Sequence, residues 1–315
     1  MKIIGTGSAI PSKVVTNDML SEFLDTSDEW IVPRTGIRSR HVISSEELED
    51  LGIEACRKAL DMSGLGPQDI DYFICSNVVN EYATPGLSCV IGAGLGLQCP
   101  CIDINCACPG FIYAMDIAEA QYRSGRVKNV LIVCCEEPTR MCDWTDRSTA
   151  VLFGDGAGAA VLTAGDNIKG ISLHCEPAPD KIWQKRLMQP TPYITKEEHD
   201  TPLQMKGREV FKFAVNASTR DVEALLKSAG MSKEDVSYYM VHQANARIID
   251  AIKQYLNEPD SKFPSNIADH GNSSSASCPI LLDECNRKGL FKKGDILVFS
   301  AFGAGLLSGA AIVEW

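Results

Sequence analysis

The chain has no long apolar run and a deficit of positive charge. No stretch approaches the roughly 18 consecutive apolar residues that a membrane-spanning helix needs, so we expect no membrane span. The 30 Lys and Arg residues are outnumbered by 41 Asp and Glu residues, which gives a formal net charge of −11. A general nucleic-acid surface needs a positive field, and this balance argues against one.

A signal peptide and metal-binding spacing are also missing. The first residues, Met1-Lys2-Ile3-Ile4-Gly5, resemble a first strand and not a secretory signal, so we expect a cytoplasmic protein. The 13 cysteines are odd in number and mostly flanked by apolar residues, which is typical of reduced core thiols. The close pairs Cys99–Cys101 and Cys106–Cys108 lack the two-residue gap of common zinc knuckles, and we expect no metal.

Strand-like and helix-like segments alternate along the 315 residues, of which 45% are hydrophobic. This alternation predicts an α/β protein with a mixed, mainly parallel sheet. The expected strands are 2–5, 71–75, 101–105, 129–134, 159–162, 296–299 and 310–313, and the expected helices are 47–63, 88–94, 108–124, 209–229, 246–256 and 275–288. The proline-rich residues 175–205 are expected to form a loop or cap.

The chain repeats itself at a spacing of 166 residues. Asp69-Ile70-Asp71 corresponds to Asp235-Val236-Ser237, and Lys128-Asn129-Val130 corresponds to Gly294-Asp295-Ile296, each 166 positions later. This period is too long for a solenoid. It predicts two α/β halves, residues 1–166 and 167–315, related by a pseudo-twofold axis. Generic strand and helix spacing shared by two unrelated halves is the alternative.

Cys108 is placed where a strand turns into a helix, in Asn105-Cys106-Ala107-Cys108-Pro109-Gly110. A thiol at a helix start feels the positive end of the helix dipole, which favours the nucleophilic thiolate. Shifted by 166 positions, Cys108 falls on Ser274, so the two equivalent turns should point at one centre. A buried structural cysteine, like its neighbour Cys106, is the alternative.

His242 and Asn272 stand in comparable positions in the second half. His242 follows a buried strand in Val241-His242-Gln243, and Asn272 precedes a helix in Gly271-Asn272-Ser273. A capping histidine and a plain helix N-cap are the alternatives. Together with Cys108, the two residues form the set expected of a thiol nucleophile with two hydrogen-bonding assistants.

These motifs resemble the 3-oxoacyl-[acyl-carrier-protein] synthase III family of the thiolase superfamily. The similarity extends over nearly the whole chain and includes Thr26-Ser27-Asp28-Glu29-Trp30-Ile31, Asp143-Trp144-Thr145-Asp146-Arg147 and Phe153-Gly154-Asp155-Gly156-Ala157-Gly158. The resemblance implies a thiolase-like fold in which two pseudo-symmetric halves form a five-layer αβαβα sandwich. It also implies a homodimer, and coenzyme A thioester as a substrate with no permanently bound cofactor.

The resemblance further implies a decarboxylative Claisen condensation. Cys108 would take an acyl group from an acyl-CoA primer, with the N–H groups of Cys108 and Ala304 stabilising the oxyanion. His242 and Asn272 would then donate hydrogen bonds to the thioester carbonyl of malonyl-acyl carrier protein as CO₂ leaves. The product would be 3-oxoacyl-acyl carrier protein, the first intermediate of fatty acid synthesis.

Roles in substrate binding are implied for further residues. Trp30 and Arg147 would sandwich the adenine of coenzyme A, Arg34 would contact its phosphates and Asn245 would hold the pantetheine arm. Four basic residues would dock the acidic carrier protein: Arg208, Lys212, Arg247 and Lys253. A solvated charged face with no partner is the alternative for this group.

Three segments depart from the family pattern, and other functions stay open. Ala304 stands where the family commonly has glycine, Thr84-Pro85-Gly86 where Phe-Pro-Ser is familiar, and Gln254-Tyr255 where two basic residues are common. A relative that primes polyketide or quinolone synthesis is one alternative, and a Cys-His-Asn hydrolase is another. A dinucleotide-binding turn at Gly5-Thr6-Gly7-Ser8 is disfavoured by Pro11, which disrupts the required helix.

Overall fold

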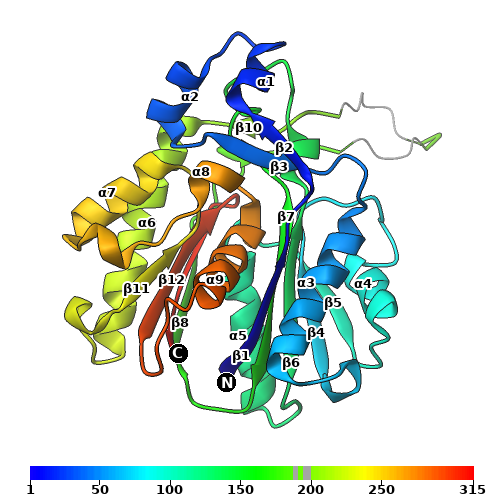
Figure 1. Cartoon of the computed structure of the whole chain (residues 1–315), viewed down its shortest axis with the longest axis vertical. Helices are drawn as coiled ribbons and strands as arrows, with labels where there is room; N and C mark the ends of the chain where they lie inside the picture. The colour runs from blue at the N-terminus through cyan, green and yellow to red at the C-terminus, as the bar shows by residue number, and fades with distance from the viewer. Residues whose placement is uncertain (187–190, 194–199) are drawn as a thin grey trace.

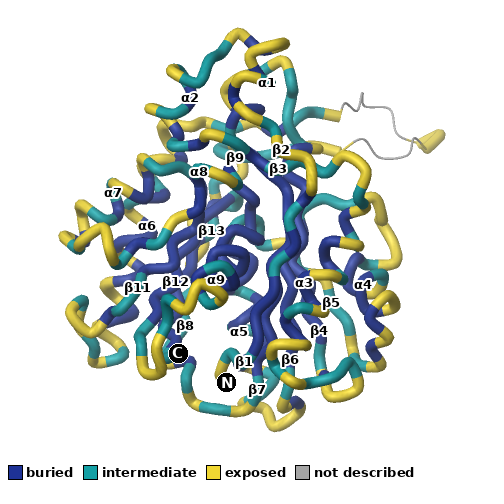
Figure 2. The backbone as a smooth tube through the Cα atoms, viewed as in Figure 1, coloured by how far each residue is buried: buried dark blue, intermediate teal, exposed yellow. Residues whose placement is uncertain are grey.

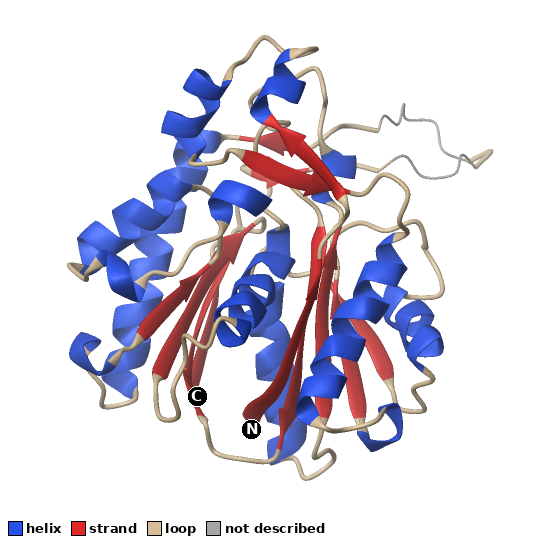
Figure 3. Ribbon diagram, viewed as in Figure 1, coloured by secondary structure: helices blue, strands red, loops and turns tan. Residues whose placement is uncertain are grey.

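The computed structural model describes residues 1–186, 191–193 and 200–315, and two β-sheets dominate it (Figures 1 and 3). The first sheet has the order β1-β7-β6-β4-β5 and the second the order β11-β12-β13-β8. Strands β4, β5 and β6 run parallel, as do β11 and β12, and the remaining pairs are antiparallel. The strands span β1 Lys2–Ala9, β4 Tyr72–Ser76, β5 Cys101–Ile104, β6 Val130–Glu136, β7 Gly156–Thr163, β8 Ile168–Cys175, β11 Tyr238–Val241, β12 Ile296–Gly303 and β13 Leu307–Glu314.

Helices form three layers around the two sheets. Helices α5 and α9 contact strands of both sheets and lie between them, α3 and α4 cover the outer face of the first sheet, and α6 and α7 cover the outer face of the second (Figure 1). The helices span α3 Leu48–Ser63, α4 Leu87–Leu95, α5 Gly110–Arg123, α6 Gly207–Ser228, α7 Ala246–Leu256 and α9 Ser277–Arg287. The predicted five-layer αβαβα arrangement is therefore confirmed.

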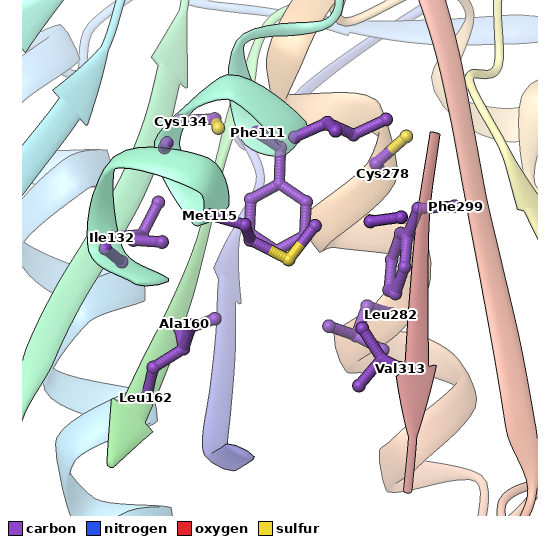
Figure 4. Packing of buried hydrophobic residues seen from close by; sticks show 14 of the residues in the cluster. Phe111, Met115, Ile132, Cys134, Ala160, Leu162, Cys278, Leu282, Phe299 and Val313 are labelled. Atoms are coloured by element: carbon purple, nitrogen blue, oxygen red, sulfur yellow. The ribbon is translucent and has the colours of Figure 1, made fainter. Parts of the chain in front are cut away.

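The central layer holds the core of the molecule. Both sheets and the faces of the helices that meet them are buried, while the outward faces of α3, α6 and α7 are exposed (Figure 2). Phe111 and Met115 of α5 meet Phe299 of β12 in this layer, with the two phenyl rings 5.7 Å apart in an edge-on contact (Figure 4). The two halves thus share one hydrophobic cluster.

The internal repeat is visible in matching elements, with one adjustment. β4 and β11 begin 166 residues apart, but α5 and α9 begin 167 residues apart. Ala107 and Ser274, which have positive φ in the two equivalent turns, are also 167 apart, so the counterpart of Cys108 is Ser275 and not Ser274 as predicted. The turn of the second half carries one additional residue. The boundary between residues 166 and 167 stays a prediction, with β7 ending at Thr163 and β8 beginning at Ile168.

Shorter elements cover one end of the two sheets, at the top of Figure 1. They are α1 Asn17–Ser21, α2 Asp28–Thr35, α8 Ile267–His270, the ribbon of β2 Lys13–Thr16 with β3 Ser39–Val42, and the ribbon of β9 Ile182–Trp183 with β10 Gln204–Met205. The predicted loop 175–205 thus contains two short strands, and its residues 187–190 and 194–199 lie outside the described residues. The alternative dinucleotide turn is wrong, because residues 5–8 lie inside β1. Among the described residues, no helix combines the length and apolarity needed to cross a membrane.

Close approach of β1 to α3 depends on glycine, which gives a stability prediction. A Cβ atom on Gly7 would lie 2.1 Å from the carbonyl oxygen of Ala55, a backbone atom that cannot move away alone. We expect Gly7→Ala to lower the free energy of unfolding by about 3 kcal/mol through overpacking, as measured by urea denaturation. Gly207→Ala is the matched control, because its added Cβ would meet nothing within 4 Å. Equal stability of the two variants would contradict this packing.

Candidate active site

Cys108, His242 and Asn272 line one cavity of about 200 Å³. Cys108 follows β5, His242 follows β11 and Asn272 follows α8, so three elements distant in the sequence meet there. The strands end at this edge of both sheets, where the carboxyl ends of parallel strands form a crevice in α/β proteins. The convergence expected from the internal repeat is present in the structure.

Cys108 stands on a strained turn packed tightly against the turn after β12. The preceding Ala107 has φ of +49°, a left-handed conformation that non-glycine residues seldom adopt. A Cβ atom on Gly303 would lie 2.8 Å from the backbone nitrogen of Cys108, so this position requires glycine. Ala304, the departure noted above, lines the same cavity one residue later.

The thiol of Cys108 is less acidic than its position suggested. Burial raises the pKa of Cys108 to about 12, the negative charge of Glu136 adds to the rise, and a hydrogen bond from Ser274 counters it in part. Helix α5 begins at Gly110, two residues later than predicted, so Cys108 lies in the turn just before the helix. Burial opposes the favourable effect expected from the helix dipole.

Two backbone donors are available for an oxyanion beside Cys108. The N–H groups of Cys108 and Ala304 donate to no acceptor within the part of the chain that the structure describes. Both residues line the cavity. The oxyanion site expected from the resemblance has its two donors in reach, and that role remains a proposal.

His242 is a buried, neutral hydrogen-bond donor. Its side chain is almost wholly buried, and burial lowers the pKa of His242 to about 3. Its Nδ1 lies 2.6 Å from the hydroxyl oxygen of Ser277, which accepts the N–H of Gln243 at 3.3 Å. Because the Ser277 hydroxyl already accepts a hydrogen bond from Gln243, we infer that it donates to Nδ1 and that the ring proton stands on Nε2.

The side chain of Asn272 is oriented in a similar way. Its Oδ1 accepts the backbone N–H of Ser274 at 2.9 Å. Its own backbone is held by Leu152 and Gly154, with N–H···O distances of 2.9 and 3.1 Å. Because the oxygen is engaged, the Nδ2 group is the end left to donate into the cavity.

Three residues expected to bind the nucleotide end of coenzyme A lie together. Trp30 of α2 contacts two guanidinium groups, with Arg34 4.7 Å and Arg147 4.9 Å from its ring centroid. Arg147 also donates to the backbone carbonyl and the carboxylate of Asp25. A ring inserted between Trp30 and Arg147 would have to displace this guanidinium, so the sandwich requires movement of Arg147.

Asn245 has a structural task in addition to the expected one. Its Oδ1 caps α7 by accepting the N–H of Arg247 at 2.9 Å, and its Nδ2 donates to the carbonyl of Arg34 at 3.1 Å. The side chain thereby joins α2 to α7 and still lines the cavity. One amide proton stays available for a ligand.

The four predicted docking residues differ in their surroundings. Arg208, Lys212 and Arg247 are exposed, and none forms an ion pair with a described residue. Lys253 is mostly buried and contacts Asp250 at 2.8 Å and Asp260 at 3.0 Å. Its charge is already compensated, so Lys253 fits the docking prediction least well.

Several residues of the site were not predicted from the sequence. Ser277 and Ser274 orient the two donors, and their signal in the sequence was the run of small polar residues after Asn272. Glu136 is buried near Cys108, and its signal was a carboxylate at the end of an apolar strand. The cavity wall is mainly apolar, and it comprises Met141, Leu203, Met205, Val210, Phe211 and Ile248 among others. Across the described residues no group of three His, Cys, Asp or Glu side chains could hold a metal ion.

Comparison with known proteins gives a consistent family. Residues 102–177 match the family described as 3-oxoacyl-[acyl-carrier-protein (ACP)] synthase III, and residues 226–315 match its C-terminal family. Beta-ketoacyl-[acyl-carrier-protein] synthase III of Clostridium acetobutylicum is 38% identical, over 100% of this chain and 98% of that protein. The crystal structure of 3-oxoacyl-[acyl-carrier-protein] synthase III from Aquifex aeolicus has a TM-score of 0.92 and 38% identity, with 100% and 99% of the two chains covered. The priming beta-ketosynthase of the R1128 polyketide pathway has a TM-score of 0.93 and 34% identity, with 99% and 95% covered.

The low pKa of His242 gives a prediction about pH. Its ring resonances are expected not to titrate between about pH 5 and pH 8 in an NMR experiment, because the folded protein keeps the imidazole neutral. In the unfolded chain a histidine takes up a proton near about pH 6.5. The unfolded state then binds more protons, so the free energy of unfolding should fall by about 1.4 kcal/mol per pH unit below this value, until the folded protein also takes up the proton near pH 3. His242→Gln should lack this component, and a normally titrating His242 would contradict the derivation.

Proposed function

Because the chain belongs to the 3-oxoacyl-[acyl-carrier-protein] synthase III family, we propose that it condenses an acyl-CoA primer with malonyl-acyl carrier protein and so initiates fatty acid synthesis. The observation that carries the proposal is the meeting of Cys108, His242 and Asn272 in one mainly apolar cavity. A thiol nucleophile and two neutral hydrogen-bond donors are the groups that this reaction needs.

In the first half-reaction Cys108 attacks the thioester carbonyl of the acyl-CoA. The negative charge that develops on the carbonyl oxygen is stabilised by the N–H groups of Cys108 and Ala304, which have no other described acceptor. Free coenzyme A leaves and an acyl group remains on the sulfur. Gly303 keeps the two donors close together, because only glycine lets this turn approach Cys108.

In the second half-reaction the donors act on the malonyl thioester. The Nε2–H of His242 and the Nδ2–H of Asn272 bind its carbonyl oxygen and stabilise the enolate that forms as CO₂ leaves. Both donors are neutral, and each is fixed by a bond on its far side, from Ser277 and from the N–H of Ser274. The enolate carbon then attacks the acyl group on Cys108 and releases the thiolate.

The proposal also covers the residues that bind the substrates, the cellular location and the oligomeric state. Trp30, Arg34 and Arg147 bind the nucleotide end of coenzyme A, and Asn245 holds the pantetheine arm. Arg208, Lys212 and Arg247 dock the acidic carrier protein, with Lys253 contributing less because Asp250 and Asp260 compensate it. We further propose a cytoplasmic homodimer that needs no permanently bound cofactor.

A specialised priming synthase is the second candidate. The 34% identity to the priming beta-ketosynthase of the R1128 polyketide pathway supports it, and the chemistry at the cysteine would be the same. The two candidates differ in the primer and in the carrier protein that receives it. The Cys-His-Asn hydrolase has less support, because a His242 with its pKa near 3 is a poor base for activating water.

Intact mass spectrometry tests the first half-reaction. Incubation with acetyl-CoA, isobutyryl-CoA and hexanoyl-CoA should add the mass of one acyl group to the protein, and Cys108→Ala should add none. His242→Ala and Asn272→Ala should still be acylated but should lose at least about a hundredfold in condensation, because their donors act on the malonyl thioester. Folded protein that accepts no acyl group from any of these esters would refute acyl-CoA as the donor.

Charge reversal tests carrier-protein docking. We expect Arg247→Glu to raise the KM for malonyl-acyl carrier protein about tenfold and to leave acyl transfer from coenzyme A unchanged, because Arg247 is exposed and does not line the cavity that holds Cys108. Lys253→Glu is the matched control on the same helix and should change this KM less, since its charge is already paired. An equal loss in both half-reactions of Arg247→Glu would refute the docking role.

A further inference from the structure

The internal repeat relates the pair Cys108 and His242 to a second pair of residues, and both members of that pair are serines. Ser76 ends β4 and lies 166 residues before His242, while Ser275 lies 167 residues after Cys108. The hydroxyl of Ser76 donates to the hydroxyl oxygen of Ser275 at 3.1 Å, and both side chains are buried. Neither serine lines the cavity of the candidate active site. The second pair is therefore a closed polar contact between the two halves.

Glu136 holds this serine pair from below the cavity. It is the last residue of β6 and has no exposed surface. Its Oε1 accepts the hydroxyl of Ser275 at 2.5 Å and the hydroxyl of Ser274 at 3.3 Å. Its Oε2 accepts the backbone N–H of Val78 at 3.0 Å. One carboxylate of the first half thus binds two hydroxyls of the second half, and no step of the proposed condensation uses it.

Ser274 connects this carboxylate to Asn272. Its hydroxyl donates to Glu136, and its backbone N–H donates to Oδ1 of Asn272 at 2.9 Å. Its φ of +51° is a left-handed conformation that a non-glycine residue keeps only where surrounding contacts fix it. Glu136 supplies such a contact, so the direction of the N–H that orients Asn272 depends on Glu136.

The equivalent turn of the first half has the same backbone and lacks this anchor. The Oδ1 of Asn105 accepts the N–H of Ala107 at 3.3 Å, and Ala107 has a φ of +49°. Asn105 is exposed, and the side chain of Ala107 has no group that could donate to a carboxylate. The carboxylate anchor is thus found in the turn whose asparagine is buried and lines the cavity, which is Asn272.

We propose that Glu136 is a positioning residue that holds the Nδ2 group of Asn272 in the direction needed for donation to the malonyl thioester. It acts through the hydroxyls of Ser274 and Ser275, and Ser76 fixes the orientation of Ser275. The inference rests on the proposed function in taking Asn272 as a donor in the second half-reaction. A donor fixed in advance needs no reorientation when charge develops on the substrate.

Glu136→Gln is the sharpest variant, because it keeps the volume of the side chain but replaces one of its two acceptor oxygens by a donor group. Replacing the serines would disturb the turn of Cys108, since a Cβ atom on the neighbouring Gly110 would already lie 2.0 Å from Oγ of Ser76. We expect Glu136→Gln to lower kcat of condensation about tenfold, the effect of one lost hydrogen bond to a charged group. The KM for malonyl-acyl carrier protein and the rate of Cys108 acylation should stay within about twofold.

Double variants show whether Glu136 acts through Asn272. In the Asn272→Ala background the donor is gone, so adding Glu136→Gln should lower condensation no further. In the His242→Ala background the amide of Asn272 is still present, so Glu136→Gln should again cost about tenfold. A further tenfold loss in the Asn272→Ala background would overturn the proposal, as would an acylation rate that falls as much as condensation in the single variant.

Asp283→Asn is the matched control for a carboxylate with a structural role alone. Asp283 is buried as well, and it accepts the hydroxyls of Thr6 and Ser8 of β1, both at 2.7 Å. Its further described partner is Arg287, so its hydrogen bonds do not reach the turn that Glu136 holds. We expect Asp283→Asn to lower the midpoint of urea denaturation but to leave kcat of condensation within about twofold. A loss of kcat that follows stability equally in both variants would overturn the proposal.

Hydrogen exchange, followed by mass spectrometry of peptides, tests the anchor without the condensation reaction. In Glu136→Gln the backbone amides of residues 272–275 should exchange about tenfold faster, whereas those of the equivalent residues 105–108 should not change. If the unmodified protein does not condense acyl-CoA with malonyl-acyl carrier protein but the variant shows this exchange pattern, the proposed function fails and the anchoring of Asn272 stands. Unchanged exchange of residues 272–275 would overturn the anchor, whatever the activity of the protein.

Discussion

Everything in the site depends on the burial of α5 and α9 between the two sheets. This layer fixes the separation of the sheets, and the edge-on contact of Phe111 with Phe299 joins the halves through one shared cluster. The ends of β5, β6, β11 and β12 consequently open on the same cavity. A thiol from one half and two donors from the other therefore line one cavity.

A second constraint follows from how deeply the reacting groups are buried. Ionised groups are costly in such a place, so the donors are neutral and obtain their direction from hydrogen bonds on their far side. Ser277 fixes the tautomer of His242, and the N–H of Ser274 fixes the amide of Asn272. Donors oriented in advance need no reorganisation when charge develops, which is the main source of catalysis by such sites.

The sequence predicted the layers and the trio, but not the groups that tune them. Strand and helix periodicity and the 166-residue repeat depend on local patterns, so the two halves and the meeting of Cys108 with His242 could be inferred. Ser277 stands in a run of small polar residues, and its partner His242 lies 35 residues away along the chain. Glu136 resembles any carboxylate at a strand end, and its serine partners come from the other half of the chain. The one-residue shift of the second turn and the burial that raises the pKa of Cys108 also depend on tertiary packing.

The cations proposed for docking are exposed and the catalytic cavity is buried, so dissolved salt should affect the two differently. Arg208, Lys212 and Arg247 lie at the surface, where an ionic strength of about 0.15 M screens charges beyond roughly 8 Å. His242 and Asn272 are buried and line a cavity with a mainly apolar wall. In the proposed function, ionic strength would therefore govern how often a carrier protein arrives, whereas the bond-making steps would proceed in a medium whose polarity the protein itself has set.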